Sequence, residues 1–296
     1  MKALFKRWGI FLTVNLLVLA VLGIILSFFG LEQQDWMGLL VICAVFGFSG
    51  ALISLLLSKT MAKMSYQIKP LKRENATGKA LYLYDTIEKM AAHRGIKMPE
   101  FGIYQSADNN AFATGASKNK SLIAFSSGIM QNLDEDELAA VAGHEMTHIT
   151  EGDMVTTTLL MGTLNTFVMF LAQIVGAIIS GALRGKDNDN RARSTIAYGS
   201  SYLIVMVLQN VLMIFANVVL AAYSRHREYA ADAGAADLTS PGHMITALEK
   251  ISGGHVREKK EDAYSIAKIY NLNAVTLFAT HPPIKKRIEA LRKMTV

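Results

Sequence analysis

Long apolar runs alternate with polar stretches along the chain, and the lengths of these runs predict its organisation. A helix needs about 20 apolar residues to cross the hydrocarbon core of a bilayer. Four runs reach that length, at residues 10–29, 37–57, 155–183 and 195–223. A short acidic loop separates the first two runs, so residues 10–57 predict a transmembrane hairpin. We expect the last two runs to form a second hairpin.

The polar stretches between and after these runs predict a soluble part that contains both helices and strands. Residues 80–94 carry apolar side chains at helical spacing and end before Gly95, which is typical of an amphipathic helix. Short strands are predicted at 101–105, 111–115 and 121–125. The second of these consists mostly of small residues, and we expect it at a sheet edge, where an extended peptide can pair with it. The stretch 224–296 is expected to be mostly helical.

The most regular soluble helix is predicted to begin at Asp134 and to continue to Gly152. Asp134 followed by Glu137 is a capping box, in which each side chain accepts a hydrogen bond from a free backbone donor of the first turn. Apolar residues then recur with helical spacing at Leu138, Val141, Ala142 and Met146. This helix contains the pattern H-E-x-x-H at residues 144–148.

The H-E-x-x-H pattern points to metal chemistry. His144 and His148 are four residues apart, so on a helix they share a face and can reach one metal ion. Glu145 stands beside the first histidine, where a general base can take a proton from an attacking water. The alternative is a pair of histidines on a surface helix without a metal. The spacing fits zinc, and it also fits cobalt or manganese.

A catalytic zinc ion usually has three protein ligands and one water, so a further ligand is needed. The residues with suitable chemistry are Glu228, Asp232, His226, His243, His255 and His281. Glu228 and Asp232 are four residues apart and share a helix face, so one can bind the metal while the other orients an imidazole. Spacing alone does not choose between Glu228 and a residue such as His226.

Composition favours an integral membrane protein over a soluble one, because 51% of the residues are hydrophobic and only 18% are charged. The net charge of +6 is explained by flanks that face anionic lipid rather than by nucleic-acid binding. The single cysteine, Cys43, excludes an intrachain disulfide and a cysteine metal cluster.

Charge also predicts the topology. Basic residues flank both ends of the first hairpin and its loop has none, so the positive-inside rule places both ends in the cytoplasm. Arg225 and Arg227 follow the fourth run and favour the same side, so both halves of the site would face the cytoplasm. The loop at 184–193 is basic, against the rule, and we nevertheless expect the second hairpin to cross.

Several segments together resemble the HtpX family, bacterial membrane zinc metallopeptidases related to the CAAX prenyl proteases. These segments are H-E-x-x-H, N-A-F-A-T-G at 110–115, R-H-R-E-Y-A-A-D at 225–232, H-P-P at 281–283 and the four apolar runs. The resemblance covers essentially the whole chain. It implies a mainly α membrane protein, with four transmembrane helices and a cytoplasmic zincin-like (gluzincin) α+β catalytic domain that contains a small sheet.

The apolar runs divide the chain into four parts, and the resemblance implies what the two polar parts do. The expected parts are an N-terminal transmembrane hairpin at 1–58, a cytoplasmic catalytic part with H-E-x-x-H at 59–154, a second transmembrane hairpin at 155–223, and a cytoplasmic catalytic part with the third zinc ligand at 224–296.

By the same resemblance, one Zn²⁺ is expected to be bound by His144, His148 and Glu228, while Asp232 orients a ligand. Glu145 is the implied general base. The remaining implied residues are His281 and Arg287, which would stabilise the developing oxyanion, and Asn110 and Ala111, which would hold substrate.

The function implied by the resemblance is zinc-dependent endopeptidase activity on misfolded or damaged membrane proteins, as part of protein quality control and the stress response. The expected location is the bacterial cytoplasmic (inner) membrane, as a multi-pass protein with both termini and the active site in the cytoplasm. The expected partners are such substrates and the lipid bilayer, with no nucleic acid.

Two other function classes compete with this one. A zinc-binding membrane scaffold or sensor would bind metal without cutting, and it would not depend on Glu145. A four-helix transporter or channel predicts charged groups in the middle of its spans, and the four apolar runs contain none.

Overall fold

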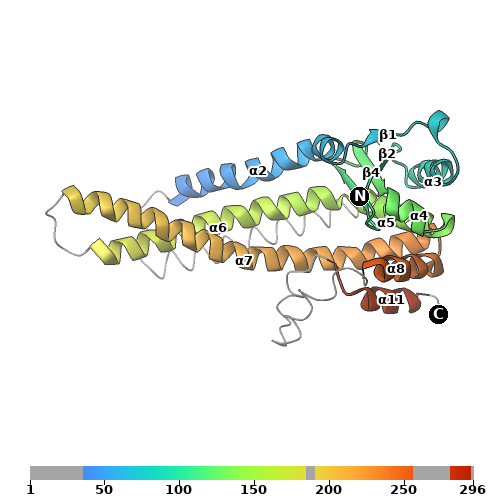
Figure 1. The fold of residues 1–296 in the computed structure, drawn as a ribbon. Helices are drawn as coiled ribbons and strands as arrows, with labels where there is room; N and C mark the ends of the chain where they lie inside the picture. The colour runs from blue at the N-terminus through green and yellow to red at the C-terminus, as the bar shows by residue number, and fades with distance from the viewer. Residues whose placement is uncertain (1–35, 185–190, 256–280, 295–296) are drawn as a thin grey trace. The chain divides into compact units, whose positions relative to one another are not determined.

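The computed structural model describes residues 36–184, 191–255 and 281–294 (Figure 1). The chain divides into two compact units. The first is built from the described residues of Met1–Ile53 and Thr158–Leu220, and the second from those of Ser54–Thr157 and Ala221–Val296. The first predicted apolar run, at 10–29, lies outside the described residues.

Within the described ranges, three helices are long and apolar enough to cross a membrane. They are α2 (Trp36–Ser65), α6 (Asp153–Arg184) and α7 (Arg191–Leu238). They contain the three apolar runs predicted after residue 35, and the helical prediction for these runs is confirmed. In α7 the helix continues past the apolar run without a break. The physical reason is that residues 224–238 are rich in alanine and other helix formers and contain no proline; the next proline is Pro241.

Close helix contacts hold the first unit together. A methyl group at Gly47 of α2 would lie 2.5 Å from Thr166 Oγ1 of α6, so glycine is needed for this approach. Trp36 packs edge-on against Phe170, with ring centroids 6.4 Å apart. Small residues and interlocking rings of this kind are what holds apolar helices together when lipid surrounds them.

The second unit contains a four-stranded sheet in the order β1-β2-β4-β3. The strands are β1 (Lys69–Pro70), β2 (Glu100–Tyr104), β3 (Ala111–Gly115) and β4 (Ser121–Ser126). Strand β4 runs parallel to β2 and antiparallel to β3. The three predicted strands are confirmed, and β3 lies at an edge as expected. The two-residue strand β1 was not predicted.

Helices cover one face of this sheet and form the main core. Alternate strand residues such as Phe101 and Ile123 pack against α3 (Lys79–His93) and α5 (Glu135–Glu151). The other set of alternate residues, including Tyr104 and Leu122, packs against Ile68. Because β4 is covered on both faces, all six of its residues are buried.

Helix α5 is the element that positions the site. Its predicted capping box is present: Asp134 accepts from the Glu137 backbone and Glu137 accepts from the Asp134 backbone, while Gly152 ends the helix in the left-handed conformation. Lys250 of α8 (Pro241–His255) forms ion pairs with both carboxylates.

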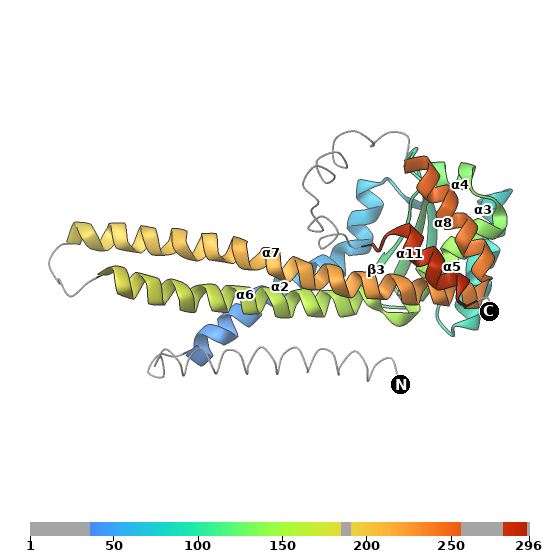
Figure 2. The ribbon, with the colours of Figure 1, turned by 90° about the horizontal axis from the view of Figure 1, so that it is seen from below.

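A small apolar cluster joins α5 to α7, α8 and α11 (Ile284–Arg292), whose arrangement can be followed in Figure 2. The remaining elements are the short helix α4 (Ser127–Asn132) and the 3-10 turn η1 (Arg73–Asn75). The apolar cluster that joins α5, α7, α8 and α11 consists of Ala140, Ala235, Ala236, Met244, Leu248, Ile288 and Leu291.

Candidate metal centre

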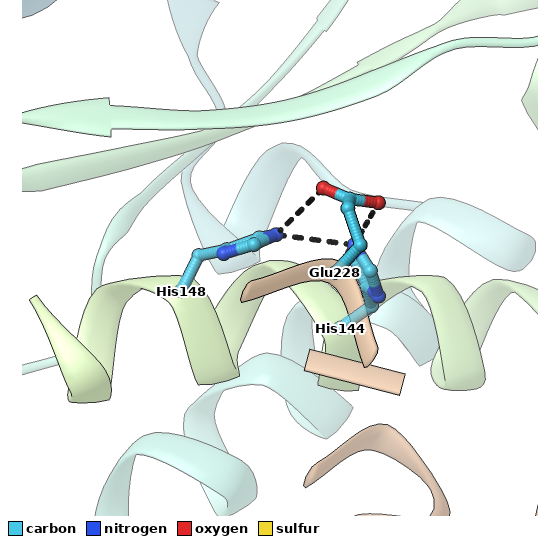
Figure 3. Close-up of side chains that lie close together, drawn as sticks. All are labelled: His144, His148 and Glu228. Carbon is cyan, nitrogen blue, oxygen red and sulfur yellow. Dashed lines mark hydrogen bonds and ion pairs between the residues drawn. The ribbon is translucent and has the colours of Figure 1, made fainter. Parts of the chain in front are cut away.

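Helices α5 and α7 bring two histidines and a glutamate together (Figure 3). The Nε2 atoms of His144 and His148 lie 3.1 Å apart. Glu228 Oε1 lies 3.5 Å from His148 Nε2, and Glu228 Oε2 lies 3.7 Å from His144 Nε2. Among the described residues, this is the group of histidine, cysteine and carboxylate side chains whose ligand atoms all lie within 4.8 Å of one another.

Glycines at the crossing of the two helices make this approach possible. A methyl group at Gly143 would lie 3.2 Å from the Cα of Ala235. A methyl group at Gly234 would lie 2.5 Å from Cγ2 and 2.9 Å from Cβ of Thr147. Gly143 is next to His144 and Gly234 lies six residues after Glu228, so the absence of their side chains lets α7 bring Glu228 to the histidines.

Hydrogen bonds on the far side of each imidazole determine which nitrogen faces the centre. His144 Nδ1 donates to Asp232 Oδ1 over 3.0 Å, and His148 Nδ1 donates to Asp153 Oδ2 over 2.8 Å. A proton on Nδ1 leaves the lone pair on Nε2. Each histidine therefore presents an acceptor nitrogen to Glu228.

This donor set fits a divalent metal ion. Two imidazole nitrogens and a carboxylate converge on one point, and without a cation these acceptors repel one another. Glu228 is 4% exposed, and its Oε2 atom makes ion-pair contacts but no well-directed hydrogen bond within the described part of the chain. Two histidines and a glutamate are also a known ligand set of catalytic zinc.

The raised pKa of His148 shows that the centre also favours positive charge. Burial alone lowers the pKa of His148, but its hydrogen bonds with Asp153 and Glu228 outweigh burial and raise that pKa to about 10. A proton on His148 competes with a metal ion for the same lone pair, so metal binding at this site must release it.

His281 and Arg287 both reach Glu228. His281 Nδ1 lies 2.9 Å and Arg287 Nη1 lies 3.1 Å from Glu228 Oε2. The close contact with the Glu228 carboxylate raises the pKa of His281. Because α11 begins at Ile284 with Pro283 at its N-cap, His281 does not cap this helix. The role of both residues in oxyanion stabilisation stays a prediction.

The buried Arg287 guanidinium is also bound to Asp232. Its Nε donates to Oδ2 over 2.8 Å and its Nη2 donates to Oδ1 over 2.6 Å. Asp232 is thereby placed between Arg287 and His144, and its burial and its hydrogen bonds with both neighbours leave it little freedom. The orienting role of Asp232 stays a prediction, and Arg287 contacts the same carboxylate.

The other predicted residues lie as follows. Glu145 is 9% exposed on α5, directly after His144. Asn110 donates from Nδ2 to the Tyr104 hydroxyl over 3.0 Å, and Ala111 opens β3 opposite Phe125. Their contact with substrate stays a prediction.

Of the alternative third ligands, neither His226 nor His243 belongs to the described ligand group, and the side chain of His255 lies outside the described residues. His226 is exposed, and His243 is near Asp136 of α5.

Sequence reasoning missed Asp153 and Arg227. Asp153 accepts from His148, and Arg227 Nε lies 2.7 Å from Asp153 Oδ1. The available signal was weak: an aspartate five residues after His148, behind the glycine that ends the helix, and an arginine next to Glu228.

Comparisons with known proteins identify the family of the chain. The sequence profile of Peptidase family M48 matches residues 78–295. Protease HtpX of Tolumonas auensis is 43% identical over 297 residues, covering 98% of this chain and 99% of that protein. Protease HtpX of Stenotrophomonas maltophilia (strain R551-3) is 43% identical over 294 residues, covering 99% of this chain and 100% of that protein.

A solved structure shares the fold. The crystal structure of S. mikatae Ste24p aligns with a TM-score of 0.61 at 19% identity, covering 97% of this chain and 67% of that one.

Proposed function

The chain belongs to peptidase family M48 and is a multi-pass membrane metalloendopeptidase, and we propose that its metal is one Zn²⁺ held by His144, His148 and Glu228. The observation that carries this proposal is the convergence of three ligand atoms, with both imidazoles oriented by carboxylates on their Nδ1 side. When bound, zinc lowers the pKa of a coordinated water toward neutrality and polarises the scissile carbonyl.

Glu145 performs the proton transfers in this proposal. It is buried beside the ligand histidines, where a carboxylate can accept the proton of the attacking water and deliver it to the leaving amine. A carboxylate that is not itself a ligand is free to make both transfers. General acid–base catalysis of this kind typically contributes about 10²–10⁴-fold to the rate.

His281 and Arg287 complete the proposed catalytic group. The His281 side chain is 67% exposed while its Nδ1 touches Glu228, so the rest of its ring can meet a substrate carbonyl. Arg287 is buried at Glu228 and adds positive charge to the side of the centre where an oxyanion develops. Asp232 accepts hydrogen bonds from both His144 and Arg287, and it thereby orients the His144 imidazole.

The substrate is proposed to bind as an extended strand along β3. Among the described strands, β3 lies at the end of the sheet and pairs with β4 alone, which leaves its outer edge for a peptide. Asn110 and Ala111 lie where this strand begins. Recognition through the backbone suits an enzyme that acts on misfolded chains, because it does not require a particular sequence.

In the membrane, we propose four transmembrane helices, with residues 10–29 as the first. The hairpins are 1–58 and 155–223, and the parts 59–154 and 224–296 form a cytoplasmic zincin-like (gluzincin) catalytic domain. This topology follows from the basic flanks of the spans. The proposed location is the bacterial inner membrane, and the proposed substrates are misfolded or damaged membrane proteins.

The test is cleavage of an unfolded protein by the detergent-purified chain, with and without a chelator, alongside Glu145→Gln. We expect the wild type to cut, the chelator to stop it, and the variant to bind zinc but lose at least about 100-fold in rate. If Glu145→Gln cuts as fast as the wild type, the assignment of the base is wrong. A chain that binds zinc but cuts no soluble or membrane-embedded substrate would contradict the proposed function.

A further inference from the structure

We propose that Asp153 and Arg227 form a positioning pair that holds the ligand histidine His148 in place. This inference rests on the proposed metal site and adds two residues to it. Asp153 is the first residue of α6, directly after Gly152, and Arg227 lies in α7 directly before Glu228. The pair thus links one ligand histidine to the helix that carries the third ligand.

The side chains of His148, Asp153 and Arg227 contact one another in that order and are largely buried. His148 Nδ1 donates to Asp153 Oδ2 over 2.8 Å, and Asp153 Oδ1 lies 2.7 Å from Arg227 Nε. Side-chain exposure is 18% for His148, 11% for Asp153 and 12% for Arg227. Little water reaches these contacts, so each group depends on its protein partners for its polar contacts and its orientation.

Backbone geometry explains how Asp153 reaches His148. Gly152 has a φ of 64°, a left-handed conformation that a residue with a Cβ adopts only at a cost. This turn ends α5 and starts α6 immediately, so the Asp153 carboxylate folds back onto the last turn of α5. At the first position of α6, its negative charge is also stabilised by the free backbone donors of that helix.

Asp153 acts on the metal site by fixing the orientation and the tautomer of His148. An imidazole without a partner on Nδ1 rotates about its Cβ–Cγ bond and carries its proton on either nitrogen. Asp153 removes both freedoms and directs the Nε2 lone pair toward Glu228. Groups that orient a metal ligand in this way typically change metal affinity about 10–100-fold when they are lost.

Arg227 holds the Asp153 carboxylate in position, and the manner of its contact predicts which substitutions at Arg227 are tolerated. Its Nε atom is close to Asp153 but poorly directed for a hydrogen bond, and its Nη2 atom has no hydrogen-bond partner among the described residues. Arg227 therefore acts chiefly through its charge. Arg287, by contrast, donates two well-formed hydrogen bonds to Asp232.

This contrast yields a direct experiment on the full-length chain in detergent. Zinc affinity is measured by competition with a chromophoric chelator, and the ligand geometry is followed by the visible spectrum of the cobalt-loaded protein. The variants are Asp153→Ala, Arg227→Met and Arg227→Lys. The control is Asp237→Asn, which breaks the ion pair of Arg94 and Asp237 in the same unit. Circular dichroism checks that each variant is folded.

We expect Asp153→Ala to weaken zinc binding about 10–100-fold and to alter the cobalt spectrum. Arg227→Met should weaken binding in the same direction, while Arg227→Lys keeps the charge and stays within about threefold of wild type. With zinc in excess, Asp153→Ala should recover most of its kcat, because the pair acts on the ligand and not on the reacting atoms.

Two results would overturn the inference. In the first, Asp153→Ala and Arg227→Met bind zinc as the wild type does, although Glu228→Gln abolishes binding; the proposed function would then stand without the pair. In the second, Asp237→Asn weakens binding as much as Asp153→Ala, which would mean a general loss of stability. If the wild type itself binds no zinc, the proposed metal site fails first, and that failure is seen before any variant is compared.

Discussion

Replacing Gly234 by alanine tests whether the close approach of α5 and α7 builds the metal centre. Gly234 lies in α7, six residues after Glu228, and faces Thr147 of the H-E-x-x-H segment. A methyl group at this position would lie 2.5 Å from Thr147 Cγ2 and closer still to Oγ1. Thr147 cannot easily move away, because it is β-branched and its hydroxyl donates to Gly143 O over 2.8 Å.

Two opposing terms set the effect on stability. In a helix, alanine is favoured over glycine by about 0.8–1.0 kcal/mol. Overpacking a filled contact costs about 1–3 kcal/mol. The net expectation for Gly234→Ala therefore runs from about zero to about 2 kcal/mol of destabilisation. Relief of the contact requires α7 to move away from α5, and Glu228 moves with it.

Gly253→Ala is the matched control. Gly253 is an exposed glycine of α8, and a methyl group there would meet nothing within 4 Å. This variant should gain the helix preference without the overpacking cost. The difference between the two variants isolates the overpacking term, about 1–3 kcal/mol, which corresponds to a gap of roughly 2–12 °C in melting temperature.

The assays are thermal unfolding followed by circular dichroism and zinc affinity by chelator competition. We expect Gly234→Ala to melt below Gly253→Ala and to bind zinc more weakly, since metal sites tolerate ligand displacements of only about 0.2 Å. If Gly234→Ala melts as high as the control and keeps wild-type zinc affinity, the idea that this glycine sets the ligand spacing is refuted.

Three further predictions concern single features of the site. Arg287→Lys should weaken zinc binding more than Arg227→Lys does, because lysine cannot reproduce the two hydrogen bonds to Asp232; equal affinities in a competition titration would contradict this. Removing metal with a chelator should lower the melting temperature, and added zinc should restore it in a concentration-dependent way, since a ligand that binds only the folded state stabilises it; a melting temperature independent of zinc would count against the site. Asp134→Ala should cost about 1 kcal/mol near neutral pH through loss of the helix cap. The hydrogen bond from the Glu137 backbone lowers the pKa of Asp134, so this cost should be present above the pKa of an unfolded aspartate and disappear as the pH falls through the folded value; a cost that persists in acid, measured by thermal unfolding, would exclude this explanation.

Local features of the structure were readable from the sequence. The capping box of Asp134 and Glu137 lies within one helical turn, so its residues specify the start of α5 without help from the rest of the fold. The same holds for the apolar runs that form α2 and α6, and for the left-handed Gly152 that ends α5. The edge position of β3 was also predicted, from its small residues. Periodicity and backbone preference act over a few residues, which is why these features need no tertiary information.

Only the tertiary structure decided which distant side chains meet at the histidines. The sequence alone left Glu228 as one of six candidate ligands, His226 among them, and resemblance to a family was needed to choose Glu228. The fold brings Glu228 to the histidines because Gly143 and Gly234 let α7 pack tightly on α5, with His226 on the exposed side. Asp153 and Arg227 carry no recognisable pattern, since their contact with His148 depends on the turn at Gly152 and on the packing of α7. Contacts of this kind come from the burial of whole helix faces, and no short stretch of the chain encodes them.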